Sequence, residues 1–522
     1  MDTPPSEGGE VDISFPWTYF RYETLYNGST WLNGFDIPFF GSNLMSPYLH
    51  IFRIPFCDPP HFSRLSTGVW IWLLLLAPLV TLAQPLPYPD SFSFIQVPNP
   101  LAEINPAFPL VDAPLPGVGE PFWDPRFGTL QTRVTVADGI NGRHEYSRFD
   151  PFNADQSLIV LLNEDGGFLV YRTGAVPYNQ EANRVLDLDI QEPRWDASDP
   201  HRLWGIQEYR IVTVEVLTGE QTVIKDFTSD PVVGPVIRDS PVYRITTQEE
   251  GEASQDFRYW VFMLQGDDRA EYLPLYLFTW DRETDTVPGV YPLPETERVI
   301  DWVGMSWQGN FVIIGGDPGN TGHTKGLTLA NRELTRFHQL AYDTAHSDVG
   351  LDADGREVIV MQNSRTDYVD MIPLEWTTQP VLVASDYASS GIIPIIRLFY
   401  SSNSPQGLQS GVHISCNYPG YALISTTIEP GLPEQNWLDR SMVLARLDQA
   451  EPSVYYMAKQ HNTTGSYWEE THAAITRDGS KIVWADNWGL NAGESQMFLM
   501  QLDLPPRWPS LITGIVDWLM FE

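Results

Sequence analysis

One short phrase recurs along the chain, and it constrains the fold more than any other feature. Its clearest copy covers residues 471–489, THAAITRDGSKIVWADNWG. A histidine opens an alternating run, Asp478 and Gly479 follow, and a second apolar run comes next. Asp-Gly between two short apolar runs is the strongest local signal for a β-hairpin. The sequence therefore predicts two antiparallel strands joined by a tight turn.

Copies of this phrase lie upstream, spaced at roughly 45–65 residues. Residues 346–360 form the nearest copy, residues 144–160 a looser one, and residues 411–425 the loosest. A unit of this size that repeats is typical of the blades of a β-propeller. We therefore predict an all-β, seven-bladed β-propeller over residues 128–504, with six or eight blades as alternatives.

A propeller must close its ring of sheets. The predicted blades contain residues 144–171, 192–217, 242–280, 299–315, 346–373, 413–447 and 472–502. The segment at residues 130–136, LQTRVTV, alternates cleanly and precedes the first blade. A strand from one end of the chain that pairs with the last blade hides two sheet edges at once. We expect residues 130–136 to be the outer strand of the seventh blade.

Residues 68–83, GVWIWLLLLAPLVTLA, form an uncharged apolar run. Arg64 precedes the run and small residues end it, which is typical of a secretory signal peptide. The run is shorter than the about 20 residues of a membrane-spanning helix, and a signal anchor is the alternative. We expect residues 64–83 to direct export to the periplasm or the outside of the cell, with membrane contact only through this segment.

The other segments outside the propeller have less pattern. Residues 1–63 show no sustained period, so we expect them to be disordered or to follow a start codon placed too far upstream. Residues 84–127 are rich in proline, which indicates an extended linker or a wrapping arm. We expect residues 505–522 to form a C-terminal tail that lies outside the ring.

The charge of the chain excludes one class of partner. Sixty-seven acidic residues against 31 basic ones give a net charge of −36, and a field of that sign repels a nucleic-acid backbone.

Cys57 and Cys416 are the two cysteines, and cleavage after residue 83 leaves Cys416 without a disulfide partner. An exported protein without disulfides favours a bacterial source.

Four of the seven predicted blades open with a histidine: His144, His346, His413 and His472. The first strand of each blade lines the central channel of a propeller, so the four imidazoles can converge on one axis. Neutral imidazole is the commonest protein ligand for divalent transition metals. The sequence therefore predicts either a metal centre at the hub or a set of hydrogen-bonded histidines that staple the strands around water.

The repeated phrases resemble those of the TolB-like propellers of bacteria, and the blades that begin with histidine resemble oligogalacturonate lyases. The phrases that carry this resemblance are HEYSRFDPFNADQSL, EPRWDASDP, HSDVGLDADG and THAAITRDGSKIVWADNWG. The resemblance implies a manganese-type divalent ion at the hub, with calcium or zinc as alternatives. It implies His346, His413, His472 and Gln460 as its ligands. The family's H-x-H pair is missing here, because Ala474 stands two residues after His472.

The same resemblance implies a lyase that acts on acidic oligosaccharides by β-elimination. Such a reaction removes a weakly acidic proton beside a carboxylate, so a cation must neutralise that carboxylate and a neutral histidine can take the proton. We assign these two roles to Arg148 and His144. The alternative is a non-catalytic TolB-like propeller that binds a protein or a glycan of the cell envelope.

Overall fold

The computed structural model describes residues 95–102, 110, 113–124, 126–138, 142–163, 167–398, 412–427, 437–463, 469–490 and 494–502. The chain divides into two compact units after residue 81, and all described residues lie in the second unit. The predictions for residues 1–63, 64–83 and 505–522 lie outside the described residues. Among the residues that are described, no helix is long and apolar enough to cross a membrane.

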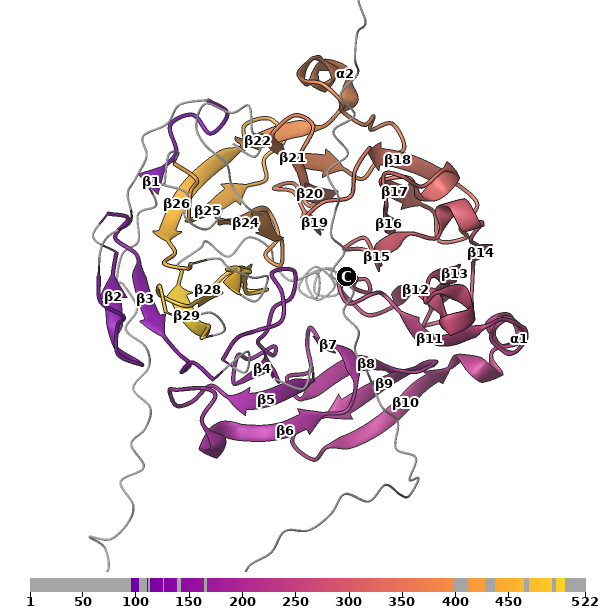
Figure 1. The fold of residues 1–522 in the computed structure, drawn as a ribbon, viewed down its shortest axis with the longest axis horizontal. Coiled ribbons are helices and arrows are strands. Elements are labelled where there is room, and N and C mark those ends of the chain that lie inside the picture. The colour runs from indigo at the N-terminus through magenta and orange to yellow at the C-terminus, as the bar shows by residue number, and fades with distance from the viewer. Residues whose placement is uncertain are drawn as a thin grey trace, which may run out of the picture. The chain divides into compact units, whose positions relative to one another are not determined.

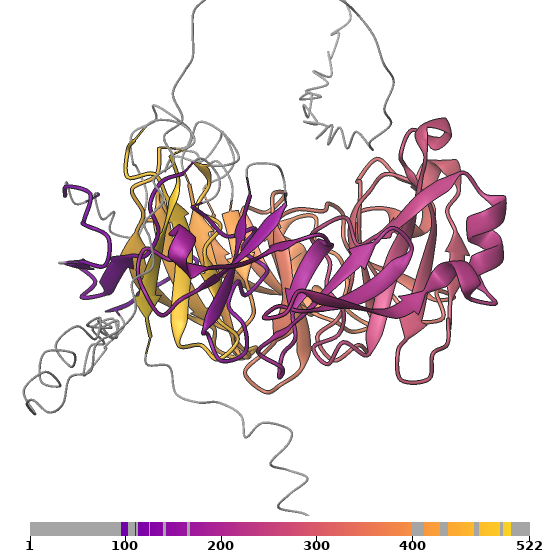
Figure 2. The ribbon, with the colours of Figure 1, turned by 90° about the horizontal axis from the view of Figure 1, so that it is seen from below.

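Seven antiparallel sheets surround a common centre and form a ring (Figure 1), which is seen from its side in Figure 2. The prediction of a seven-bladed propeller is thereby confirmed, and each predicted blade corresponds to one sheet. Blade 1 contains β4 (Leu158–Leu162), β5 (Phe168–Arg172) and β6 (Arg184–Leu188). Blade 2 contains β7 (Gln191–Trp195), β8 (Arg202–Gln207), β9 (Arg210–Glu215) and β10 (Glu220–Asp226).

The next three blades have four strands each. Blade 3 contains β11 (Val242–Thr246), β12 (Tyr259–Gly266), β13 (Pro274–Asp281) and β14 (Val290–Pro292). Blade 4 contains β15 (Ile300–Met305), β16 (Val312–Gly316), β17 (Leu327–Ala330) and β18 (Phe337–Ala341). Blade 5 contains β19 (Ser347–Leu351), β20 (Glu357–Asn363), β21 (Tyr368–Pro373) and β22 (Ile393–Arg397). Helices α1 (Val233–Asp239) and α2 (Tyr387–Ser390) lie on the outside of the ring (Figure 1).

The last two blades recruit strands from the N-terminal side of the propeller. Blade 6 contains β23 (Val412–Ser415), β24 (Tyr421–Thr426), β25 (Ser441–Arg446) and β26 (Ser453–Lys459), with β1 (Ile95–Gln96) added at its edge. Blade 7 contains β27 (Ala474–Ile475), β28 (Lys481–Asp486) and β29 (Gln496–Gln501), followed by β3 (Leu130–Arg133) and β2 (Pro121–Trp123). Thr132 pairs with Leu499, so the expected closing strand is in place.

Packing between neighbouring blades explains why the middle strands read as continuous apolar runs. A strand that is covered by a blade on each side has both faces buried, and β4, with the sequence LIVLL, is buried along its whole length. The core between blades 2 and 3 is aromatic, with Trp204, Phe227 and Phe262 packed together. The Asp-Gly signal also holds, because Gly479 adopts a φ of 69° in the turn before β28.

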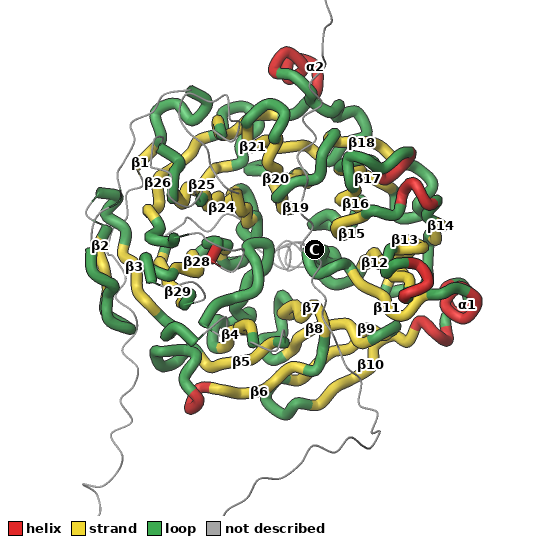
Figure 3. The backbone as a smooth tube through the Cα atoms, viewed as in Figure 1, coloured by secondary structure: helices red, strands yellow, loops and turns green. Residues whose placement is uncertain are grey.

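Blade 1 departs from the expected pattern at its inner edge. Residues 143–150 precede β4 without forming a strand, and this loop runs beside the centre of the ring (Figure 3). The Asp150 carboxylate accepts the Phe152 N–H, and the Pro151 carbonyl accepts the N–H of Val160. The Leu162 N–H also donates to the Arg143 carbonyl, so the segment is attached to β4 at both ends. Between these ends residues 144–150 form no strand and can carry their side chains to the hub.

Candidate functional site

Three histidines from three blades meet at the hub. His346 directly precedes β19, His413 lies in β23, and His472 lies two residues before β27. The ring centroids of His346 and His413 are 4.6 Å apart, and those of His413 and His472 are 4.1 Å apart. His413 and His472 are buried, whereas His346 is half-buried. The imidazoles that open three of the predicted blades thus lie together.

A carboxylate joins two of these rings. Glu470 Oε2 lies 2.5 Å from His413 Nε2 and 3.6 Å from His472 Nε2. One ligand-type atom from each of these three residues lies within 4.8 Å of the other two, which is a spacing that suits a metal ion. Glu470 stands two residues before His472. In the sequence, this nearness to a hub histidine is the one sign that Glu470 belongs to the hub.

The charges in this group suit a cation. Burial alone would raise the pKa of Glu470, but the hydrogen bond from His413 and the nearby His472 ring hold it well below its usual range. Burial lowers the pKa of His472 well below its ordinary value, and His413 and Arg143 lower it further. At neutral pH an anionic carboxylate therefore faces a neutral imidazole. Nitrogen and oxygen donors of this kind bind divalent transition metals.

Tyr146 completes the hub from the loop before β4. Its hydroxyl is 3.0 Å from His346 Nδ1, and its ring meets the edges of His413 and His472 at centroid distances of 5.4 and 5.0 Å. Burial lowers the pKa of His346 to about 3, and His413 and Arg148 contribute to the decrease. Tyr146 thus contacts all three histidines and keeps their rings in one place.

The same loop clamps His472 from two sides. Arg143 Nη2 is 2.5 Å from His472 Nδ1, and His144 Nε2 donates to the carbonyl oxygen of His472 at 2.6 Å. His472 has a φ of 44°, in the left-handed region that costs a non-glycine residue roughly 1–3 kcal/mol. Burial lowers the pKa of His144 to about 3, followed by the effect of Arg143. His144, for which we predict the role of catalytic base, is fully buried and holds the His472 backbone.

Arg148, for which we predict the role of substrate-binding cation, has partners within the protein. It forms a 3.0 Å ion pair with Glu250, donates to Ser347 Oγ at 3.2 Å, and stacks on the Trp302 ring at 4.1 Å. Burial raises the pKa of nearby Asp301 to about 7, and Glu250 adds to this rise. The Arg148 guanidinium bonds Ser347, the residue that follows His346 in the sequence. It is, however, already paired with the Glu250 carboxylate.

Gln460 is buried near the last two blades and also has internal partners. Its Nε2 donates to the carbonyl of Thr426 at 2.9 Å, and its Oε1 accepts the N–H of Asn462 at 2.9 Å. Both ends of the amide therefore bond to backbone groups. The oxygen that lies beside the hub histidines belongs to Glu470 instead. The role of Gln460 as a metal ligand stays a prediction.

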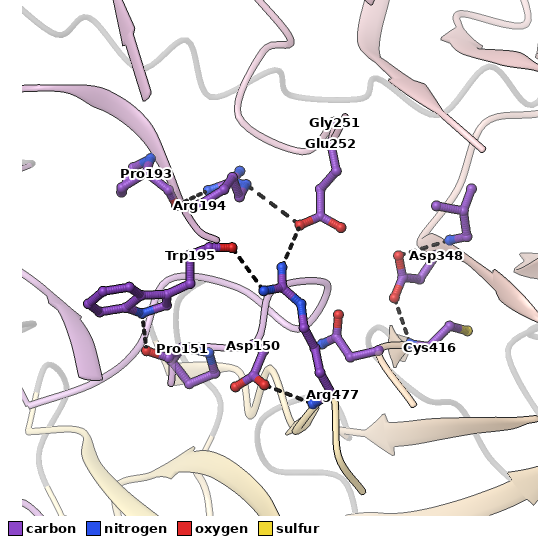
Figure 4. Close-up of polar contacts among 12 residues, drawn as sticks. Asp150, Pro151, Pro193, Arg194, Trp195, Gly251, Glu252, Asp348, Cys416 and Arg477 are labelled. Atoms are coloured by element: carbon purple, nitrogen blue, oxygen red, sulfur yellow. Dashed lines mark hydrogen bonds and ion pairs between the residues drawn. The ribbon is translucent and has the colours of Figure 1, made fainter. Parts of the chain in front are cut away.

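A second polar network fastens blades 1, 2, 3 and 7 to one another (Figure 4). Arg477 donates through Nη1 to the Trp195 carbonyl at 2.9 Å, and its Nη2 lies 3.9 Å from Glu252. Arg194 approaches the same carboxylate at 4.0 Å, while Asp150 accepts the N–H of Arg477 at 2.8 Å. Every charge here has a partner in the protein, so this network serves to hold the blades together.

Asp348 and Cys416 link blades 5 and 6 in a similar way (Figure 4). Asp348 Oδ2 accepts the backbone N–H of Cys416 at 2.6 Å, and Oδ1 accepts the N–H of Val349 at 2.8 Å. Burial raises the pKa of the Cys416 thiol well above its usual range, with a further contribution from Asp348. A thiol in that state is a small apolar group of the core and a poor nucleophile.

Comparison with known proteins finds likeness in solved structures alone. No protein-family profile matches the sequence, and no curated protein matches it either. The chain is similar to an oligogalacturonate lyase from Vibrio parahaemolyticus, with 12% identity over 74% of this chain and 96% of that one, and a TM-score of 0.46. An oligogalacturonate lyase in complex with manganese gives the same four values. The tricorn protease gives 13% identity over 70% of this chain and 34% of that one, with a TM-score of 0.39. At these values the chemistry has to be argued from the hub residues themselves.

Proposed function

We propose that this protein is an exported, metal-dependent lyase that cleaves acidic oligosaccharides by β-elimination at the hub of its propeller. The observation that carries the proposal is the group formed by His413, Glu470 and His472, whose ligand-type atoms lie within 4.8 Å of one another. The ring of His346 lies next to this group, with its centroid 4.6 Å from that of His413. Imidazole nitrogen and carboxylate oxygen are both ligands of manganese-type and zinc ions, so these residues suit such an ion.

The roles of the residues follow from their charge and exposure. When bound, the ion would neutralise the carboxylate of a uronate and favour the charge that develops on it. Glu470 would hold the ion with its negative charge. His346 is neutral and half-buried, so it is more accessible to a substrate proton than the fully buried His144. Its low pKa makes it a weak base in the free protein.

Metal analysis and a product assay test this proposal together. The full-length protein, after gentle purification and dialysis, should retain close to one divalent ion per chain. With oligogalacturonate and added manganese it should produce the ultraviolet absorbance of an unsaturated uronide, which only an elimination generates. Glu470→Gln and His413→Ala should lose both signals, while His323→Ala, an exposed histidine away from the hub, should keep both. Absence of both signals from the unmodified protein would refute the proposal.

One observation favours a second function, the non-catalytic propeller that binds an envelope protein or a glycan. The groups that a lyase needs free are engaged inside this protein: Arg148 pairs with Glu250, and His144 bonds to His472. A binding propeller needs no such free groups. Under this alternative the protein would carry no metal and yield no unsaturated product, yet it would be retained on immobilised acidic glycan or on envelope protein extracts.

Export is part of the proposal, and its support is the apolar run at residues 68–83. A C-terminally tagged chain expressed in a bacterium should appear in the periplasm or medium after cleavage near residue 83. Retention in the membrane fraction with the apolar run intact would support the anchored form. Recovery of the whole chain in the cytoplasm would contradict export.

A further inference from the structure

We infer that Arg143 holds the His472 ring as an N–H donor and thereby keeps it out of the coordination shell of a hub metal ion. The inference rests on the proposed metal site and revises it: of the group His413, Glu470 and His472, only His413 and Glu470 would ligate the ion, with His472 beside them as an N–H donor. The resemblance described above implies His472 as a ligand, whereas the contacts of this chain give it another role. Arg143 is, in these terms, a positioning residue that acts through His472.

Arg143 is the donor in its hydrogen bond with His472. A guanidinium is a donor only and keeps its charge in proteins. Because Arg143 Nη2 is 2.5 Å from His472 Nδ1, that ring nitrogen must accept, and the proton of the neutral ring must sit on Nε2. His472 Nε2 faces Glu470 Oε2 at 3.6 Å. His472 therefore presents an N–H group to the carboxylate.

Metal binding through Nε2 would require the opposite proton position on the His472 ring. A histidine that ligates through Nε2 carries its proton on Nδ1 and almost always donates it to a carboxylate, a carbonyl or water. In this protein the Nδ1 proton would point at the Arg143 guanidinium, so two donors would oppose each other. His413 has no such conflict, because its Nε2 faces Glu470 and no guanidinium contacts its ring among the described contacts.

Packing and backbone bonds fix the position of Arg143. Its side chain is fully buried, and its carbonyl accepts the N–H of Leu162 at 3.0 Å. At the preceding position, Gly142, a Cβ atom would lie 2.7 Å from the carbonyl oxygen of Ser495, so only glycine lets the backbone pass. His144 then fixes the His472 backbone. Neither partner of the Arg143–His472 bond can turn away without moving these anchors.

The proton position can be measured without any variant. In the metal-free, full-length protein labelled with ¹⁵N-histidine, the His472 resonances, assigned by comparison with His472→Gln, should show protonated Nε2 and an accepting Nδ1. A proton on Nδ1 would overturn the inference directly.

A matched pair of variants tests the effect on the metal. Arg143→Lys keeps a group that only donates, whereas the amide oxygen of Arg143→Gln can accept a proton from Nδ1 and so release Nε2. We expect Arg143→Gln to bind zinc about 10-fold to 100-fold more tightly than the unmodified protein, and Arg143→Lys to bind it with unchanged affinity. Circular dichroism would confirm that both variants are folded.

The outcomes separate this inference from the proposed function. Equal zinc affinity in all three proteins would overturn the role of Arg143 and leave the metal site standing. Binding by Arg143→Gln alone would support the role of Arg143 and refute a metal centre in the natural protein. Absence of zinc from all three would overturn both.

Discussion

For single residues, the properties of the hub histidines depend on which ring nitrogen donates a hydrogen bond and which accepts one. His144 shows this clearly, since its Nε2 donates to a backbone carbonyl while the ring stays neutral and fully buried. A neutral ring in that place cannot take up a proton until the pH approaches about 3. The same ring in the unfolded chain takes one up near its ordinary pKa of 6.5. His144 therefore makes the stability of the protein depend on pH.

His144→Gln tests this dependence. Below pH 6.5 the unfolded chain binds a proton at His144 that the native protein does not bind, so acidification costs stability at about 1.4 kcal/mol per pH unit. Glutamine can still donate to the His472 carbonyl but does not titrate. Between pH 6.5 and 4.5 the variant should therefore lose roughly 2–3 kcal/mol less than the unmodified protein. Urea unfolding across this pH range measures the difference, and parallel curves would contradict the assignment.

Arg148 gives a second prediction at this scale. Removing one member of a buried ion pair leaves the other charge without its partner, and Arg148 also bonds Ser347 and covers Trp302. We expect Arg148→Met to lower the free energy of unfolding by about 2–3 kcal/mol, toward the lower end because Glu250 is partly exposed. The surface residue Arg202, paired with Asp199, is the control, and Arg202→Met should cost less than about 1 kcal/mol. Urea unfolding measures both losses, and equal losses of unfolding free energy in the two variants would contradict this prediction.

The sequence predicts the meeting of His346, His413 and His472, because each ring occupies the same position in a repeated unit. It does not predict their partners. Arg143 and His472 are 329 residues apart and touch only because blade 1 and blade 7 are neighbours in a closed ring. The pairing of Arg148 with Glu250 likewise depends on the packing of separate blades. Side-chain pairing over such distances leaves no mark in the repeat.

At the scale of elements, the repeat is informative because hairpin signals are local. The Asp-Gly turn before β28 and the apolar runs of the middle strands are visible in a few residues each. β1 and β2 have no such signal, since they are two and three residues long and lie in a proline-rich stretch. The inner segment of blade 1 also differs from its copies, because residues 143–150 form no strand there.

Ring closure gives a prediction for the elements. A chain that begins at Ala113 lacks β1 and the buried Val97 but keeps β2 and β3, so it serves as the reference. A chain that begins at Asp138 lacks both strands and exposes the edge of β29, which is a template for pairing with another molecule. We expect the shorter chain to melt at least roughly 5 °C lower and to form oligomers. Scanning calorimetry and size-exclusion chromatography measure these effects, and a monomer with an unchanged melting temperature would show that β3 is dispensable.

At the scale of the whole molecule, the net charge of −36 is the dominant property. Many arginines of the ring are engaged in local pairs, such as Arg258 with Asp281 and Arg356 with Asp352. The excess of carboxylates therefore remains as a negative field, which opposes the compact state through self-repulsion. Because of the same field, we expect polynucleotides not to be retained by the protein.

Salt should stabilise this protein by screening that repulsion. The Debye length falls from about 30 Å at 0.01 M to less than about 8 Å above 0.15 M, so distant like charges stop interacting while close ion pairs persist. We expect the melting temperature to rise between 10 mM and 0.5 M sodium chloride. Choline chloride should act equally if screening is the cause, whereas a rise with sodium alone would indicate a bound ion. Sulfate is unsuitable because it stabilises folded proteins by exclusion from their surface. A melting temperature that stays constant or falls with either chloride salt would contradict this prediction. It would mean that many carboxyl groups with a raised pKa, such as Asp301, are protonated, so that the true net charge is smaller than the formal one.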